Sequence, residues 1–334
     1  MEVEILKIIP APVRHAVRAV LPDRAVNKIK SRLFAFLYQR GRVQHDFVWV
    51  QKAKRALHIK PTLYHLETKI TEHCNLRCLG CTNFSNIAKS HYVDLAQYTA
   101  DVNRLAELMR IQHIFIMGGE PLLHPEVGGF ALATRRAFPR ATVYVFTNTI
   151  LVPKVSEETW DEFRRARIVL FCDDYPIDID KEAIDSVAHA HGVKTKWTPY
   201  RTEFFRVPLD IEGTHGPRLM HEACRNVDNC VNLREGRLYP CGRVACMEPF
   251  IEHYGLQDRL KVSSADYMSI YDDRQPWEYM DFLTHPILWC SHCAYDEMYT
   301  FPWQRGADTL EQWTGQDRSL EISGTHQSDP TRVA

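Results

Sequence analysis

The sequence contains no long hydrophobic run and carries almost no net charge. No stretch approaches the roughly 18 consecutive apolar residues that a membrane-spanning helix requires, so we expect no such helix. The formal net charge of -1 at pH 7 favours neither nucleic acid nor a strongly acidic partner, and we predict that the protein does not bind nucleic acid. With 334 residues, 45% of them hydrophobic, the chain can form one large α/β domain and a smaller second domain.

The N-terminus also lacks the pattern of a secretory signal peptide, because Glu2, Glu4 and Lys7 interrupt its first apolar stretch. We therefore predict a cytoplasmic protein. The chain has 10 cysteines, and in a reducing compartment closely spaced cysteines are more often ligands of a metal or cluster than partners in disulfides. The cysteines are thus the first candidates for functional residues.

The small net charge conceals a strongly basic N-terminal segment. Residues 1–60 contain 13 Lys and Arg against 4 Asp and Glu, a balance of +9, and the remainder has 28 against 38, a balance of -10. Apolar residues recur at helical spacing from Val13 to Tyr38, which predicts two basic amphipathic helices separated at Pro22. Two interpretations remain open: a helical layer with a solvated basic face, or weak contact with an anionic membrane surface.

Strand and helix patterns alternate from residue 61 to residue 210. Short apolar segments predict strands at 64–70, 113–117, 142–146, 168–172 and 193–198. Helical patterns lie between them, and we expect Asp94 to cap one of these helices and Ser156 to precede another. Repeated strand–helix units form parallel sheets, whose ligands bind in loops at the carboxyl ends of the strands. We therefore predict an α/β core with a parallel sheet.

The alternation ends near residue 210. Residues 211–304 are rich in cysteine, aromatic and turn-forming residues, which predicts a smaller second domain. From Arg305 the composition becomes polar, so we predict a disordered tail over residues 305–334. The predicted order is a helical extension at 1–60, a core at 61–210, the small domain and the tail.

Three closely spaced cysteines follow the first predicted strand. Cys74, Cys78 and Cys81 have the spacing C-x3-C-x2-C. Three thiolates can bind three irons of a 4Fe-4S cluster and leave the fourth iron open to a small molecule. The alternative is zinc, but a zinc site needs four ligands, or three and a water, and no fourth ligand lies nearby in the sequence.

With residues at the ends of the next strands, this triad resembles the radical S-adenosylmethionine (SAM) superfamily. The family's GGEP motif, which lines the methionine amino group, is matched by Gly118, Gly119, Glu120 and Pro121. Thr147 and Asn148 are similar to the family's TN turn, and Asp173 stands where many members place a polar residue near the SAM ribose. The resemblance covers residues 61–210. Gly80 is a departure, since the family often has an aromatic residue before the third cysteine.

The resemblance implies a partial (β/α)6 barrel that binds SAM at the open iron of the cluster. It further implies that one electron passes from the cluster to SAM and yields a 5'-deoxyadenosyl radical, which abstracts hydrogen from a substrate. A flavodoxin- or ferredoxin-type protein would supply the electron. A non-enzymatic iron–sulfur redox sensor is the alternative of another class, although a sensor has no need of a motif that binds methionine.

Four later cysteines resemble those of the twitch domain, a short form of the SPASM extension. They are Cys224, Cys241, Cys290 and Cys293, and the resemblance implies that they hold a second, auxiliary 4Fe-4S cluster. Residues 230–233 and 237–240 predict a hairpin with Gly236 at positive φ, which would bring Cys241 next to Cys224. A structural zinc in the same four thiolates and a purely structural cluster are the alternatives.

Cys230 and Cys246 are the two cysteines of this region that are not assigned to the auxiliary cluster. The role of Cys246 distinguishes two hypotheses about the reaction. Related enzymes with a twitch domain oxidise or epimerise sugars and aminocyclitols, so we expect a small, polar, carbohydrate-like substrate. A dehydrogenase needs the auxiliary cluster as electron acceptor, whereas an epimerase needs a hydrogen donor such as Cys246. The alternative for Cys246 is a small buried hydrophobic residue. Modification of a ribosomal peptide is the other enzymatic alternative.

Overall fold

The computed structural model describes residues 54–224, 226 and 229–322. The two basic helices predicted between Val13 and Tyr38 therefore lie outside the described residues. Within the described residues, no helix combines the length and apolar character needed to cross a membrane.

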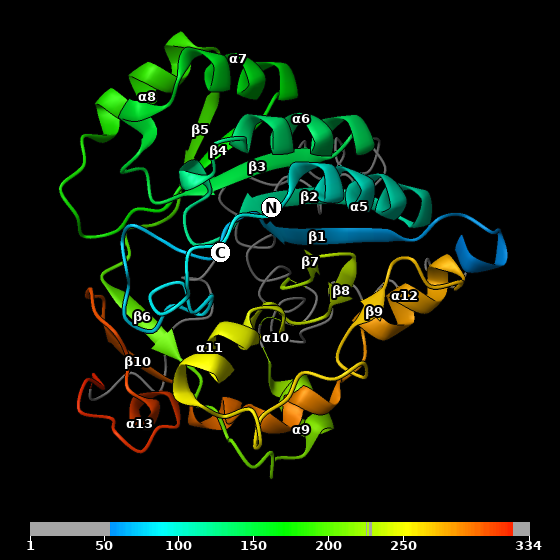
Figure 1. Ribbon diagram of the computed structural model, residues 1–334, viewed down its shortest axis with the longest axis vertical. Coiled ribbons are helices and arrows are strands. Elements are labelled where there is room, and N and C mark those ends of the chain that lie inside the picture. The colour runs from blue at the N-terminus through cyan, green and yellow to red at the C-terminus, as the bar shows by residue number, and fades with distance from the viewer. Residues whose placement is uncertain (1–53, 225, 227–228, 323–334) are drawn as a thin grey trace, which may run out of the picture. The chain divides into compact units, whose positions relative to one another are not determined.

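A parallel sheet lies at the centre of this part of the chain (Figure 1). Its parallel strands, in the spatial order β5-β4-β3-β2-β1, are β1 (Thr62–Lys69), β2 (Arg110–Met117), β3 (Thr142–Thr147), β4 (Val169–Cys172) and β5 (Lys194–Trp197). The helices between them are α5 (Leu95–Leu108), α6 (Val127–Ala137), α7 (Glu157–Ala166) and α8 (Lys181–Ala190). The predicted α/β fold with a parallel sheet is confirmed.

Two helix starts follow from local side-chain chemistry. Asp94 Oδ1 accepts a hydrogen bond from the Gln97 backbone N–H at 2.7 Å, and Ser156 Oγ accepts one from the Thr159 N–H at 3.1 Å. Each cap satisfies a backbone donor that the first helical turn leaves unpaired. The predicted cap at Asp94 is therefore confirmed, and Ser156, predicted to precede a helix, caps α7.

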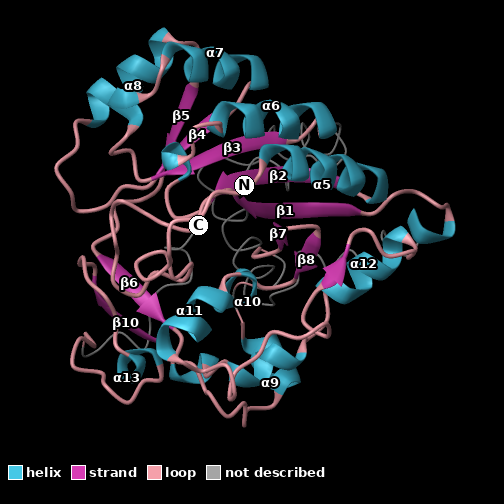
Figure 2. Ribbon diagram, in the orientation of Figure 1, coloured by secondary structure: helices cyan, strands magenta, loops and turns pink. Residues whose placement is uncertain are grey.

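The helices cover one face of the parallel strands (Figure 2). Alternate strand residues point to opposite faces, so Leu66 of β1 and Ile70 directly after it enter the core that Val102 of α5 and Phe130 of α6 also line. His65, Glu67 and Lys69 lie on the other face of β1. The sheet therefore has one apolar face and one face that is available to a site.

A hairpin extends the sheet beyond β1. β7 (Asn232–Arg234) pairs in parallel with β1, β8 (Arg237–Tyr239) pairs antiparallel with β7, and β9 (Met268–Ser269) pairs with β8. Glu235 and Gly236 have φ of 48° and 72°, as a two-residue turn of this kind requires. The hairpin and its positive-φ glycine were predicted correctly. The same sheet thus crosses residue 210, the predicted boundary between core and small domain.

The remaining elements are short helices, 3-10 turns and one further pair of strands. The helices are α9 (Pro217–Ala223), α10 (Gly242–Ala245), α11 (Met247–Tyr254), α12 (Pro276–Leu283) and α13 (Leu310–Trp313). Short 3-10 turns are η2 (Pro121–Leu123), η3 (Val152–Lys154), η4 (Leu288–His292) and η5 (Tyr295–Glu297). β6 (Glu203–Arg206) and β10 (Tyr299–Pro302) form a separate antiparallel pair. The sixth strand of the implied barrel therefore leaves the parallel sheet and pairs with β10.

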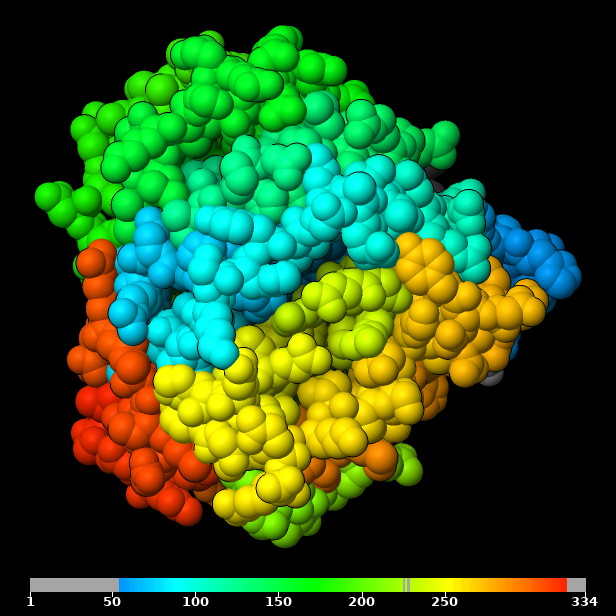
Figure 3. Space-filling model, viewed as in Figure 1, coloured from blue at the N-terminus to red at the C-terminus, as the bar shows by residue number. Residues whose placement is uncertain are grey.

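The segment after Arg305 is folded as far as Ile322, which corrects the prediction of a disordered tail over residues 305–334. Trp313 is buried against Phe84 and Phe250, with ring centroids 5.0 and 5.8 Å away. Figure 3 shows this segment in orange and red beside residues drawn in blue and cyan. A few buried side chains hold this segment in place, and the average composition of the segment, which is polar, does not reveal them.

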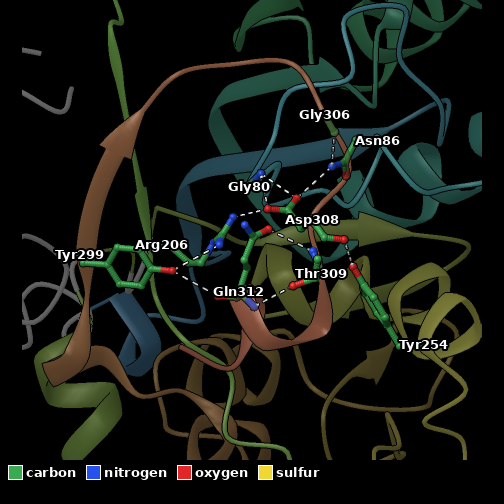
Figure 4. Close-up of polar contacts among 9 residues, drawn as sticks. All are labelled: Gly80, Asn86, Arg206, Tyr254, Tyr299, Gly306, Asp308, Thr309 and Gln312. Atoms are coloured by element: carbon green, nitrogen blue, oxygen red, sulfur yellow. Dashed lines mark hydrogen bonds and ion pairs between the residues drawn. The ribbon is translucent and has the colours of Figure 1, made fainter. Parts of the chain in front are cut away.

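One of these anchors is a buried ion pair between Arg206 and Asp308, whose side chains are 1% and 0% exposed (Figure 4). The Arg206 guanidinium lies 4.7 Å from the ring centroid of Phe301 and 4.9 Å from that of Trp313. Its charge is thus compensated by one carboxylate and by two aromatic faces. Loss of the carboxylate would leave a buried cation without its counter-charge.

We expect Asp308→Asn to lower the free energy of unfolding by roughly 3–5 kcal/mol, because it leaves the Arg206 charge buried and unpaired. Chemical denaturation of the metal-free protein measures this loss. The matched control is Glu222→Gln, which breaks the exposed pair between Arg218 and Glu222 and should cost less than about 1 kcal/mol. Equal stability of the two variants would contradict the anchoring role of Asp308.

Candidate functional site

The loop after β1 carries the cysteine triad and runs beside the end of β2. The backbone N–H of Gly119 donates to the Thr71 carbonyl at 2.9 Å, and that of Glu120 donates to the His73 carbonyl at 3.1 Å. These bonds continue the β1–β2 pairing past the ends of both strands. The structure therefore brings the predicted GGEP residues next to the cysteine loop.

Gly118 and Gly119 are required by this contact. A Cβ on Gly118 would lie 2.4 Å from the Thr71 carbonyl oxygen, and one on Gly119 would lie 2.0 Å from the His73 carbonyl oxygen. Both distances are far below van der Waals contact, so any side chain would displace the cysteine loop. The sequence interpretation explained these glycines by close approach of a ligand; in the structure, the chain's own backbone fills that space.

Glu120 is fully buried and connects the ends of two strands. Its carboxylate accepts hydrogen bonds from Thr147 Oγ1 at 2.7 Å, the Asn148 N–H at 2.8 Å and the Leu122 N–H at 3.1 Å. Burial raises the pKa of Glu120 to about 7, although these hydrogen bonds oppose the rise. The Glu120 carboxylate thus positions the turn after β3, and Pro121 begins the turn η2 beside it.

Asn148 connects that turn to the first cysteine. Its Nδ2 lies 2.8 Å from Asn75 Oδ1 and 3.5 Å from Cys74 Sγ. Thr147 and Asn148, predicted from the TN turn, therefore lie at the triad. The contact runs from the end of β3 to the loop after β1, across the carboxyl edge of the sheet.

The three thiols of the triad share one short loop, and the charge of Cys81 acts on both other thiols. Burial raises the pKa of the Cys74 thiol to about 11 and that of the Cys78 thiol to about 12, and the neighbouring Cys81 contributes to both shifts. Cys78 is buried, whereas Cys74 and Cys81 are partly exposed. Three thiols on one short loop fit the ligand set of an iron–sulfur cluster with an open iron.

The described residues contain no group of three or more His, Cys, Asp or Glu that could hold a single metal ion. A cubane differs from such a site because each thiolate binds its own iron. The fit of the triad to a cluster therefore rests on the donor chemistry and on the shared loop.

Asp173 lies at the same edge of the sheet, directly after β4. Its carboxylate accepts from Tyr175 OH at 2.8 Å and from Thr198 Oγ1 at 3.2 Å, and Arg201 Nε lies 2.9 Å away. Burial raises the pKa of Asp173, and the Arg201 charge opposes that rise. Phe84, three residues after Cys81, is fully buried against Phe250 and Trp313.

Lys69, the last residue of β1, was missed by sequence reasoning. Its ammonium contacts Cys246 Sγ and donates to Asn83 Oδ1 at 2.7 Å. Lys69 is 5% exposed and Cys246 is 1% exposed. Burial would lower the pKa of Lys69, but Cys246 and Glu67 raise it above its usual value. A lysine that ends a strand has no sequence signal of its own, because its partner is distant in the chain.

Burial has the opposite consequence for the Cys246 thiol. It raises the pKa of Cys246, although the Lys69 and Arg234 charges favour the thiolate. Arg234 is also paired with Glu72, at 2.9 Å. Cys246 therefore contacts a buried charge as well as the apolar cluster around Phe250.

A row of half-buried aromatic rings follows the face of the sheet that lies opposite the helices. Phe115 stacks on His65 with centroids 4.4 Å apart and on Tyr144 with centroids 4.5 Å apart. Tyr144 in turn contacts Phe171, and the Lys196 ammonium lies 4.9 Å from the Phe171 ring centroid. The residues alternate along their strands, so this row belongs to the same face as Lys69.

Three of the four predicted auxiliary ligands, Cys224, Cys290 and Cys293, pack against the apolar cluster formed by Val207, Met220 and Tyr295. Burial raises the pKa of the Cys224 thiol to about 12, and the charges of Cys241, Cys293 and Cys290 add to that shift. Burial likewise raises the pKa of Cys290 to about 12, with contributions from Cys241 and Cys293. The thiols come from the ends of α9 and α10 and from η4.

Cys230 is a fifth thiol at this position. Its hydrogen bond to Cys241 lowers the pKa of Cys241 to about 6, and the Cys230 pKa is raised well above its usual value. The Gly242 N–H donates to Cys230 Sγ at 3.1 Å. Cys230 and Cys224 are therefore both neighbours of Cys241. The spacing of the cysteines in the sequence does not decide which of them would bind the same cluster as Cys241.

Comparisons with known proteins agree with this geometry over the core. Residues 68–181 match the family model "Radical SAM superfamily". A GTP 3',8-cyclase from Clostridium botulinum (strain Okra / Type B1) is 28% identical over 109 residues, which are 32% of this chain and 34% of the relative. A GTP 3',8-cyclase from Chlorobaculum tepidum is 28% identical over 93 residues, 28% of each protein. The chain thus spans about a third of the length of the curated relatives it matches.

The structure of BtrN in complex with AdoMet and 2-DOIA is similar with a TM-score of 0.42 and 16% identity, over 70% of this chain and 93% of that one. The family match includes the cysteine triad, the residues at 118–121, the turn at 147–148 and Asp173. Residues 68–181 thus match the radical SAM domain, and that family implies a 4Fe-4S cluster and SAM.

Proposed function

We propose that this chain is a radical SAM enzyme that removes hydrogen from a small polar molecule, a sugar or an aminocyclitol. The observation that carries the proposal is the contact of the cysteine loop with Gly119 and with Asn148 at the carboxyl edge of the parallel sheet. Cys74, Cys78 and Cys81 would hold the first cluster. When bound, this cluster and SAM would supply a 5'-deoxyadenosyl radical, and a second cluster would accept an electron.

Polar groups on the open face of the sheet support a polar substrate. Glu67 accepts from Asn232 Nδ2 at 3.0 Å and lies 3.3 Å from His65 Nε2. Lys69 and Asn83 add a buried ammonium and a half-buried amide nearby. Such donors and acceptors can replace the water around the hydroxyl groups of a sugar or an aminocyclitol.

The auxiliary cysteines support oxidation of the substrate. A dehydrogenase must dispose of an electron and a proton after the first hydrogen atom is removed, so it needs an acceptor close to the substrate. Cys224, Cys241, Cys290 and Cys293 would hold that acceptor, a second 4Fe-4S cluster, with Cys230 as a neighbour. We further propose a flavodoxin- or ferredoxin-type protein as the source of the electron for the first cluster.

Epimerisation is the second candidate reaction, and the contact of Cys246 with Lys69 favours it. Burial raises the pKa of the Cys246 thiol although the Lys69 charge opposes that rise, and the S–H form is the one that can return a hydrogen atom to a carbon radical. The thiyl radical left on Cys246 would then take one electron from the second cluster and one proton. In that reaction the Lys69 ammonium would fix the position of the sulfur. The curated relatives are named GTP 3',8-cyclases, so a nucleotide is the alternative substrate.

The iron content should divide equally between the two groups of cysteines. We expect about eight irons and eight sulfides per chain after anaerobic reconstitution, and about four of each when Cys74, Cys78 and Cys81 are all changed to Ala. Elemental and sulfide analysis measures both. Cys172→Ala is the matched control, since this buried thiol of β4 belongs to neither group and its loss should leave the iron content unchanged.

Two results would contradict parts of this assignment. If the iron content of the triple variant equals that of the wild type, Cys74, Cys78 and Cys81 do not bind the first cluster. About four irons together with one zinc in the wild type would make the second group a zinc site, and the dehydrogenase would lose its acceptor.

Cys246→Ala distinguishes the two reactions. The assay uses a panel of sugars, aminocyclitols and nucleotides in D2O. If the enzyme is an epimerase, the variant should still form 5'-deoxyadenosine, but the recovered sugar should no longer contain deuterium from the solvent, because no thiol returns the hydrogen. A dehydrogenase should keep its product yield. Mass spectrometry measures both. Unchanged deuterium incorporation in the variant would exclude Cys246 as the donor.

A further inference from the structure

Residues 303–308, here called the strap, run antiparallel to the cysteine loop. The Leu79 N–H donates to the Gln304 carbonyl at 2.9 Å, and the Gly306 N–H donates to the Arg77 carbonyl at 3.0 Å. Cys78 faces Arg305 in the bridge between them. The strap lies outside the residues that match the family model, yet its backbone pairs with the middle cysteine of the triad.

Asp308 fixes the turn between the second and third cysteines (Figure 4). Its carboxylate accepts from the Gly80 N–H at 2.8 and 3.0 Å and from Asn86 Nδ2 at 3.0 Å. Gly80 has φ of +70°, and a Cβ there would lie 2.4 Å from the Phe301 ring. The turn is therefore held by a buried carboxylate and by a ring, with little freedom to move.

Trp303, the first residue of the strap, directs its indole at the sulfur of the middle cysteine. Trp303 Nε1 lies 3.2 Å from Cys78 Sγ. The indole stacks on the Tyr175 ring with centroids 5.8 Å apart and an interplanar angle of 21°, and the Tyr175 hydroxyl donates to Asp173. The Trp303 backbone N–H donates to the Thr202 carbonyl at 2.8 Å. The indole is thus held by its backbone and by its ring.

We propose that Trp303 is a positioning residue of the cluster site, whose indole N–H donates a hydrogen bond to the Cys78 thiolate and raises the reduction potential of the cluster. The inference rests on the proposed function, since it requires a cluster on the triad. An N–H donor stabilises negative charge on sulfur, and the reduced cluster carries one more negative charge than the oxidised cluster. The donor therefore stabilises the reduced form more than the oxidised form.

Trp303→Phe tests the proposal, because it keeps an aromatic ring against Tyr175 and removes the N–H. The midpoint potential of the first cluster should shift to a more negative value. A reductive titration followed by EPR measures it, with the first cluster identified as the signal that changes when SAM is added. Trp277→Phe is the matched control: its indole donates to the Ile59 carbonyl at 3.1 Å, away from the loop, and its removal should not move the potential.

A second measurement uses the wild-type protein and does not depend on a stable variant. With tryptophan labelled with 15N in the indole ring, pulsed EPR of the reduced first cluster should detect a nitrogen coupling. The coupling should persist in Trp277→Phe. Trp303→His, which restores a ring N–H, should recover part of the potential that Trp303→Phe loses.

The outcomes separate this inference from the proposed function. A signal that responds to SAM, together with an unchanged potential in Trp303→Phe or no nitrogen coupling in the wild type, would overturn the role of Trp303 alone. A wild-type protein with no such signal and no iron on the triad would overturn the proposed function, and the role of Trp303 with it.

Discussion

The site depends on the contact between two backbone segments, 71–74 and 118–120. The carbonyl oxygens of Thr71 and His73 occupy the space that side chains on Gly118 and Gly119 would need. This contact places the cysteine loop directly over the end of β2, and the Glu120 carboxylate then connects β2 to the turn after β3. A site that spans three strands is thus held by hydrogen bonds and by steric exclusion, without relying on long flexible side chains.

A buried ion pair also contributes to the geometry of the cysteine loop. Removal of a charge from water is costly, and a buried ion pair seldom stabilises a fold more than apolar packing would. The pair Arg206–Asp308 nevertheless lies under the cysteine loop, where Asp308 also accepts from the Gly80 N–H. An apolar pair of the same size could fill the space but could not hold this backbone turn. We interpret the pair as a means of fixing geometry at the cysteines.

The sequence predicted the parallel strands, the helix cap at Asp94, the β7–β8 hairpin and the neighbourhood of the triad, because these features depend on local periodicity or on short motifs. The contacts of Lys69 with Cys246 and of Trp303 with Cys78 could not be predicted, since each joins residues more than 170 positions apart. The folded segment after Arg305 was missed for a related reason. Its order comes from Asp308 and Trp313, two residues within a polar stretch, and from partners far back in the chain.

One strand connects the two groups of cysteines. β1 leads directly into the loop of the triad, and its Glu67 accepts from Asn232 of β7, two residues after Cys230. Cys230 in turn is hydrogen-bonded to Cys241. Because β1 and β7 are neighbours in one hydrogen-bonded sheet, the two groups are held at a fixed separation by regular structure. That rigidity would suit the proposed reaction, in which hydrogen is removed near the first group and a second step follows near the other, because a flexible connection between two domains would not fix their distance.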